Sequence, residues 1–273
     1  MTIFELLEQG AVLPFAGGVI DSSTDVSRPL VVVNPTRLSV DVRTSEPVHL
    51  AVLYTESRTS SVEITLAEQA HVSLSEIYLA KTLSAVEIRQ QRASECHILS
   101  AVLCGANTSY KIGLLGDHCA SELDAVAVAT GDEHATVAVE TRHEVADCRS
   151  RSWVKWVASG RSTGEFRGLV YVAPDAQRTD AEQQNRNIEL DGARIVATPQ
   201  LEIYADDVRC SHGSTVGYAD AEAIFYMRQR GLSEADARRL QIEGFVRDVV
   251  GRCRTAPICA LLDERVVEKL SEI

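Results

Sequence analysis

The sequence is poor in aromatic residues and has no long apolar run. Aromatic residues make up 5% of the 273 residues, whereas hydrophobic residues of all kinds make up 45%, with valine, alanine, isoleucine and leucine plentiful. This hydrophobic fraction excludes global disorder. No apolar run reaches the roughly 20 residues that a membrane-spanning helix needs, so we expect no membrane partner. Few aromatic residues and many aliphatic ones together predict a folded protein with an aliphatic, β-rich core.

Two common nucleotide-binding motifs are also absent. The sequence contains no Gly-x-x-x-x-Gly-Lys-Ser/Thr and no Gly-x-Gly-x-x-Gly after a strand. These absences exclude a P-loop and the usual dinucleotide-binding turn. Asp206 and Asp207 are adjacent, but neighbours in a strand point apart, so shared proton chemistry is not expected. We expect that the chain is not a self-sufficient enzyme.

Positive charge is scarce. The chain has 27 Lys and Arg residues against 39 Asp and Glu residues, a formal net charge of −12. A chain of this charge repels phosphate backbones, so nucleic acid is not an expected partner. Ordinary solubility is the interpretation that we favour for the acidity.

Cysteine is present in an odd number and at irregular spacing, which does not predict a disulfide framework. Residues 1–5 show no basic segment before an apolar one, and so indicate no secretory signal. We therefore expect a cytoplasmic protein with reduced thiols. The seven cysteines are Cys96, Cys104, Cys119, Cys148, Cys210, Cys253 and Cys259.

Short aliphatic strands recur every ten to fourteen residues from residue 29 onward. This spacing is typical of a sandwich, a barrel or a solenoid of β-rungs, and it does not choose among them. Few Asn-Gly or Asp-Gly turns are present, which weakens the hairpin-rich alternatives. The predicted strands are Leu30–Val33, Leu38–Val42, Val48–Tyr54, Val62–Leu66, Val72–Leu79, Val86–Arg89, His97–Leu103, Tyr110–Leu115, Ala125–Ala129, Thr136–Glu140, Trp153–Ala158 and Glu165–Val172.

Two Cys–His neighbours lie among these strands. Cys96-His97 and His118-Cys119 would each split across the two faces of a strand. Cys104 and Cys119 could meet in stacked rungs. No Cys-x-x-Cys spacing supports zinc, so we interpret these thiols as structural. Lys155, between two tryptophans, is interpreted as a residue that packs its stem against the core.

Helical periodicity marks both ends of the chain. Residues 2–9 predict a short helix that ends before Pro14. Residues 218–273 predict a helical region in which Ser233 caps one helix, Pro257 breaks the chain, and residues 261–273 form a last amphipathic helix.

The densest set of reactive side chains lies in residues 199–231. Residues 200–212 alternate as a single strand, which Gly213 and Gly217 would end before the next helix. Cys210 and His212 are two residues apart, so both point to one face of that strand. A thiolate and an imidazole on one face can bind iron or zinc, although two ligands do not complete a site. The alternative is a buried structural Cys beside a hydrogen-bonded His.

The same stretch carries a family resemblance. The runs PQLEIYADDVRCSHGSTVG (199–217) and AIFYMRQRG (223–231) resemble the C-terminal signature of the SufB/SufD family of iron–sulfur cluster assembly scaffolds. The resemblance is specific over residues 165–250. It implies a right-handed parallel β-helix capped by α-helices. We accordingly divide the chain into a short N-terminal segment (1–20), a β-helix core (21–217) and a C-terminal helical domain (218–273).

The resemblance is to SufD-like rather than SufB-like chains. Ala193 stands where SufB-like chains carry a cysteine tied to cluster assembly, so the resemblance does not make this chain alone the primary cluster-building scaffold. It implies pairing with a SufB-like chain through the end of the β-helix, and docking of the ATPase SufC on the helical domain. A transient iron–sulfur cluster would form at the subunit interface, with His212 as the first expected ligand of this chain and Cys210 as the second.

Two other functions stay open. The chain could form a homodimeric or minimal scaffold, in which a second copy replaces the SufB-like partner. It could instead be a β-solenoid carbohydrate-active enzyme, but no clustering of acidic catalytic residues is visible in the sequence.

Overall fold

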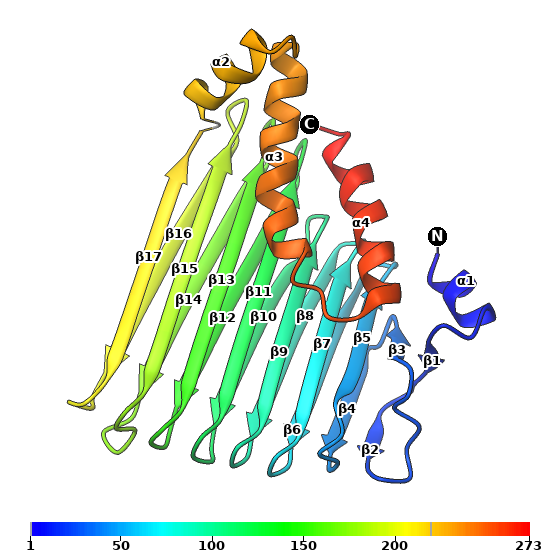
Figure 1. Ribbon diagram of the computed structural model, residues 1–273, viewed down its shortest axis with the longest axis vertical. Coiled ribbons are helices and arrows are strands. Elements are labelled where there is room, and N and C mark those ends of the chain that lie inside the picture. Colours follow the sequence, from blue (N-terminus) through cyan, green and yellow to red (C-terminus); the bar gives the residue numbers. More distant parts are fainter. Residues whose placement is uncertain (1, 219) are drawn as a thin grey trace.

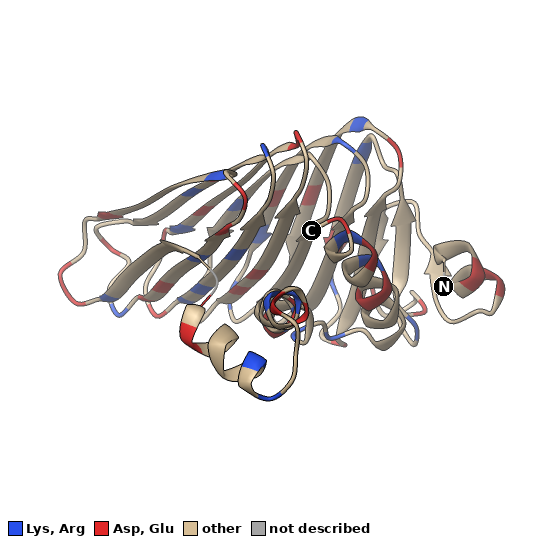
Figure 2. Cartoon of the chain, turned by 90° about the horizontal axis from the view of Figure 1, so that it is seen from above, with Lys and Arg blue, Asp and Glu red and all other residues tan. Residues whose placement is uncertain are grey.

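The computed structural model describes residues 2–218 and 220–273 as two parallel β-sheets that form opposite walls of a flattened tube (Figures 1 and 2). In the described residues, one sheet has nine strands and the other eight. The nine are β1 (Leu13–Pro14), β3 (Leu30–Val33), β5 (Val48–Tyr54), β7 (His71–Tyr78), β9 (Glu95–Val102), β11 (Ala120–Ala129), β13 (Arg149–Ala158), β15 (Asp180–Glu189) and β17 (Arg209–Gly217). The eight are β2 (Gly18–Ile20), β4 (Arg37–Val42), β6 (Arg58–Leu66), β8 (Thr82–Gln90), β10 (Asn107–Leu114), β12 (His134–His143), β14 (Thr163–Val172) and β16 (Arg194–Ile203).

Consecutive strands lie in opposite sheets, and each strand pairs in parallel with the strand two places away in the chain. β11, for example, lies between β9 and β13. This connectivity defines a parallel β-helix and explains the lack of hairpin turns, because no two consecutive strands pair. The predicted solenoid is therefore confirmed.

The turns that lead into β7, β9, β11, β13 and β15 share one backbone feature. In each of these five turns, the residue two positions before the strand has a positive φ between 54° and 61°. A non-glycine residue rarely adopts this left-handed conformation, and its recurrence shows that these consecutive rungs have the same turn conformation. The residues are Gln69, Ala93, His118, Asp147 and Arg178.

Four helices complete the described chain: α1 (Ile3–Glu8), α2 (Ala221–Gln229), α3 (Glu234–Val250) and α4 (Ala256–Leu270). α3 and α4 lie across the outer face of the nine-stranded sheet (Figure 1). Their apolar residues, such as Val246 and Leu262, pack on outward-facing Val126 and Val128 of β11. The helices thus cover one wall of the solenoid, and its last rung, formed by β16 and β17, has no helix over it (Figure 1).

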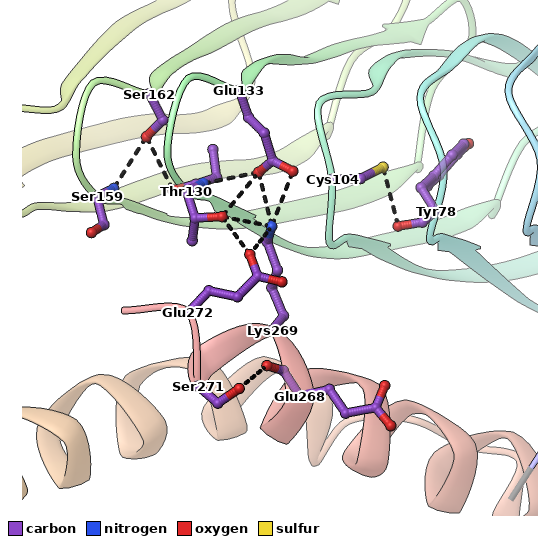
Figure 3. A network of polar contacts seen from close by, with 11 residues as sticks. Tyr78, Cys104, Thr130, Glu133, Ser159, Ser162, Glu268, Lys269, Ser271 and Glu272 are labelled. Atoms are coloured by element: carbon purple, nitrogen blue, oxygen red, sulfur yellow. Dashed lines mark hydrogen bonds and ion pairs between the residues drawn. The ribbon is translucent and has the colours of Figure 1, made fainter.

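A polar network fixes the end of α4 to the β-helix (Figure 3). The buried ammonium group of Lys269 lies 2.8 Å from the hydroxyl of Thr130 and 2.9 Å from a carboxylate oxygen of Glu133, both in the turn after β11. Glu272 completes the network at 2.8 Å from the same nitrogen. Lys155 does the same for α3, with its ammonium 2.7 Å from Asp248. The Lys155 side chain is buried as predicted, but its ammonium group is paired with Asp248 under α3 and does not reach solvent.

The strand predictions are confirmed between residues 30 and 172, whereas β1, β2 and β15 were not predicted. Every strand predicted between residues 30 and 172 overlaps an observed strand, and α1 and the Ser233 cap are as predicted. The single strand over 200–212 is wrong, because β16 ends at Ile203, a turn follows, and β17 begins at Arg209. Gly213 therefore lies inside β17 and does not end a strand. The last helix begins earlier than predicted, since Pro257 occupies its first turn.

Two predictions about cysteine are wrong. Cys253 and Cys259 form a disulfide, with 5.6 Å between their Cα atoms, because the chain reverses between α3 and α4 and brings them together. Cys104 does not meet Cys119. The thiol of Cys119 lies instead beside Cys148 of the next rung. A hydrogen bond with the Cys148 side chain lowers the pKa of Cys119. The predicted split of Cys96 and His97 is confirmed, with Cys96 in the interior and His97 on the outer face.

One carboxyl group lies inside the solenoid. Glu76 of β7 is fully buried, and the hydroxyl of Tyr54 donates a 3.4 Å hydrogen bond to it. Burial raises its pKa from 4.5 to about 7, although hydrogen bonds from three tyrosines, Tyr110, Tyr78 and Tyr54, oppose the rise. The protonated form therefore suits the core better than the ionised form.

Stability is expected to fall as the pH rises, because the folded protein holds this proton above the pKa at which the unfolded chain loses it. The loss begins near pH 4.5 and is complete above about 7. The difference between the pKa of Glu76 in the folded protein and in the unfolded chain corresponds to about 3 kcal/mol of folding free energy. Glu76→Gln should therefore be more stable than the wild type at pH 8 by up to this amount and equal to it at pH 4.5, as measured by urea unfolding. Glu63→Gln, at a half-exposed position of β6, is the control. A wild-type pH profile in Glu76→Gln would contradict the assignment.

Candidate functional site

The candidate site is the open last rung of the solenoid. β16 and β17 are the end strands of their sheets, and each pairs with a neighbour on one side only. No residue of β17 is buried, in contrast to the central strands of the same sheet. The interior of the tube is therefore exposed at this end.

The side chains of Cys210 and His212 face this open interior. In the register of β15 and β17, Cys210 lies beside Ala181 and His212 beside Gln183, and both β15 residues are buried inside the tube. The prediction that Cys210 and His212 share one face is confirmed. Because a strand rises about 3.3 Å per residue, the two side chains are separated by roughly 6.6 Å along it.

A polar layer lies directly beneath β17. The amide of Asn185 accepts a 3.1 Å hydrogen bond from the Ser214 hydroxyl, and the amide of Asn187 donates a 2.9 Å hydrogen bond to the Thr215 carbonyl. The buried amide of Gln183, under His212, has no hydrogen-bond partner among the described residues. This layer was not predicted from the sequence, although the amides of Gln183, Asn185 and Asn187 at alternate positions were a signal for it.

The thiol and the imidazole form only part of a metal site. Burial raises the pKa of the Cys210 thiol, so the thiol form is favoured in the isolated chain. Within residues 2–218 and 220–273, no three His, Cys, Asp or Glu side chains group closely enough to hold a metal ion. Further ligands would have to come from another chain that closes the open end.

Ala193 and Gly213 both have a structural role near the last rung. Ala193 is buried in the turn before β16 and packs in the core, so it brings no reactive group to the open end. Gly213 makes room for Gln184, since a Cβ there would lie 2.6 Å from the amide oxygen of Gln184. The absence of a side chain at 213 serves packing within the last two rungs.

A second exposed surface lies on α2. This helix has no buried residue, and Phe225 and Tyr226 are 62% and 60% exposed. Large exposed aromatic side chains on one short helix are typical of a protein–protein contact. We call Phe225 and Tyr226 the α2 aromatic surface. No described helix is both long enough and apolar enough to cross a membrane.

Comparisons with known proteins agree with this geometry. Residues 27–245 match the family model described as SUF system FeS cluster assembly, SufBD core domain. The chain is 32% identical over 178 residues to the iron–sulfur cluster assembly protein SufD of Escherichia coli, covering 65% of this chain and 42% of that protein. It is 30% identical over 292 residues to a SufBD family protein of Synechocystis, covering 94% and 64%, respectively. The chain thus spans less than two thirds of either relative.

Proposed function

Because the chain belongs to the SufBD family of the SUF iron–sulfur cluster assembly system, we propose that it is a SufD-like scaffold subunit. It pairs with a SufB-like chain through the open last rung. A nascent cluster forms where the two chains meet, with His212 as a ligand from this chain and Cys210 as the second. The chain has no catalytic role of its own and works as part of a complex in the cytoplasm.

The observation that carries this proposal is the exposed edge of β17. The backbone N–H of Arg209 donates to the Thr179 carbonyl, so odd-numbered residues of β17 bond to β15. Because these groups alternate in a parallel strand, the N–H groups of Ser214 and Val216 face the free edge. An unpaired edge of this kind accepts a strand from another chain.

The edge of β16 is less suited to pairing. The N–H of Tyr204 donates to the Val172 carbonyl, which places the odd-numbered residues of β16 on its free side. Pro199 is one of them and has no N–H to donate. We therefore assign the main backbone pairing with the partner to β17.

The α2 aromatic surface supports the second part of the proposal, docking of a SufC-type ATPase on the helical region. ATP binding by two such subunits would draw them together and open the interface between the scaffold chains. A homodimer is the alternative to the SufB-like partner, since two copies of β17 could pair across a two-fold axis.

Proline on the free edge of β17 tests the pairing. Ser214→Pro with Val216→Pro removes two outward N–H groups, each worth about 1 kcal/mol in a hydrogen bond, and keeps every backbone bond to β15. It also loses the hydrogen bond from the Ser214 hydroxyl to Asn185 of β15. We expect binding of the partner chain to weaken by at least about tenfold. Ser214→Ala with Val216→Ala loses the same hydroxyl but retains both backbone donors, and it should bind normally. Unchanged binding by the proline variant, at an unchanged melting temperature, would place the interface elsewhere.

A further inference from the structure

One of the three amides that point into the tube from β15 differs from the other two. Asn185 and Asn187 are hydrogen-bonded to each other, with 2.6 Å between the amide nitrogen of Asn187 and the amide oxygen of Asn185. Each also donates to a backbone carbonyl of an adjacent strand, Asn185 to Val154 at 3.2 Å and Asn187 to Thr215 at 2.9 Å. Neither the oxygen nor the nitrogen of the Gln183 amide has a hydrogen-bond partner among the described residues.

The Gln183 side chain crosses the tube from one sheet to the other. A Cβ at Gly168 of β14, in the opposite sheet, would lie 2.6 Å from the amide carbon of Gln183, so the absence of a side chain at 168 makes room for the amide. Gln183 is fully buried. An unpaired buried amide destabilises a fold, and an apolar side chain of similar size would fill the same space without that penalty. Packing alone therefore does not explain a glutamine at this position.

His212 lies directly above this amide. The two residues are partners in the register of β15 and β17, and strands of one sheet lie about 4.8 Å apart, so both side chains point into the tube as neighbours. The other inward residues of β15 have no free acceptor to offer. Ala181 has no polar side chain, and the amide oxygen of Asn185 already accepts from Asn187 and from Ser214. The oxygen of Gln183 is thus the uncommitted acceptor beneath the ring.

An imidazole that binds a metal through one ring nitrogen carries a proton on the other, and this N–H almost always donates to an acceptor. We propose that the Gln183 amide oxygen is this acceptor, which makes Gln183 a positioning residue that orients the His212 ring when His212 binds the nascent cluster. Because neither amide atom has another partner, the amide turns its oxygen toward the ring without breaking a hydrogen bond. The inference rests on the proposed function, since it requires His212 to be a ligand.

Gln183→Met tests the inference, because methionine is similar in shape to glutamine and has no amide. In the anaerobically purified complex, we expect iron and labile sulfide per folded complex to fall by about 10- to 100-fold, the usual effect of losing a group that supports a metal ligand. The melting temperature should stay the same or rise, because the variant removes an unpaired buried amide. A glutamine that serves only the fold would show the opposite, a lower melting temperature with cluster content lost only in proportion to folded protein.

Two further variants separate the acceptor from the bulk of the side chain. Gln183→Glu keeps an acceptor oxygen in the same place and should retain most of the cluster content per folded complex. Gln200→Met makes the matched exchange at an exposed position of β16, also in the last rung, and should behave as the wild type does.

Wild-type cluster content per folded complex in Gln183→Met would overturn the positioning role and leave the scaffold proposal standing. Equal losses in Gln183→Met and Gln183→Glu, at unchanged melting temperatures, would show that the acceptor oxygen is not what matters and would overturn it as well. A wild-type complex that holds neither iron nor sulfide contradicts the proposed function itself, and the role of Gln183 falls with it. The wild-type sample therefore distinguishes the two failures.

Discussion

Replacing Phe225 and Tyr226 by alanine is expected to abolish binding of a SufC-type ATPase at an unchanged melting temperature. Both side chains are largely exposed, and α2 buries none of its residues in the rest of the chain. The fold therefore loses little packing when they are removed. Aromatic side chains at the centre of an interface commonly contribute 2 kcal/mol or more each, so we expect affinity to fall at least about 100-fold.

The matched control for this change is Phe4→Ala. Phe4 is 63% exposed on α1, at the other end of the solenoid, and should not affect ATPase binding. Affinity measured by surface plasmon resonance or by co-elution separates the two variants. If the double variant binds the ATPase as well as the wild type does, docking on the α2 aromatic surface is wrong.

Replacing His212 by alanine is expected to reduce the cluster content of the complex at least about tenfold. Mutation of a residue that only supports a metal ligand lowers metal affinity by about 10- to 100-fold. Loss of the ligand itself should lower the affinity at least as much. The ring of His212 makes no hydrogen bond or ion pair with the described residues, and it is exposed at the open end. The folded chain should therefore keep its stability, its pairing and its ATPase binding.

Iron and labile sulfide per folded complex, with the melting temperature of the same sample, distinguish a ligand from a structural residue. A structural His212 would lower the melting temperature, and cluster yield would fall only in proportion to folded protein. Ser211→Ala is the control, because Ser211 adjoins His212 but points to the outer face of β17. His212→Cys should retain part of the cluster, since thiolate also binds iron. If the complex of His212→Ala has wild-type cluster content, His212 is not a cluster ligand.

The sequence predicted the strands whose inward positions are aliphatic. β6 shows the rule, since Val62, Ile64 and Leu66 alternate with polar residues and all three face the core. β15 escaped prediction because its inward residues include Gln183 and Asn185. Asn185 makes hydrogen bonds to Val154 and Ser214 in the adjacent rungs, and local hydrophobic periodicity does not report such contacts.

The turn between β16 and β17 escaped prediction for a different reason. Ala205 continues the apolar alternation of Leu201 and Ile203, so the pattern extends through the turn without a break. The place where α3 and α4 pack could not be predicted from the sequence either. Their apolar faces predict helices that pack on another element, but the partner is the outer face of β11 and its neighbours, which is distant in the sequence.

The candidate site was partly predictable. Spacing alone placed Cys210 and His212 on one face of a strand, and the register of β15 and β17 confirms it. That the strand is the last of the solenoid, with its inner face open, depends on how all the rungs stack.

The most direct test of the scaffold assignment is anaerobic purification of the tagged chain from cells that express it with its neighbouring gene products, followed by iron and acid-labile sulfide analysis. The account predicts that the chain elutes in a complex with a SufC-type ATPase and a SufB-like chain, or a second copy of itself. It also predicts that this complex carries iron and sulfide. A chain that elutes alone, or a complex that holds neither iron nor sulfide under these conditions, would contradict it.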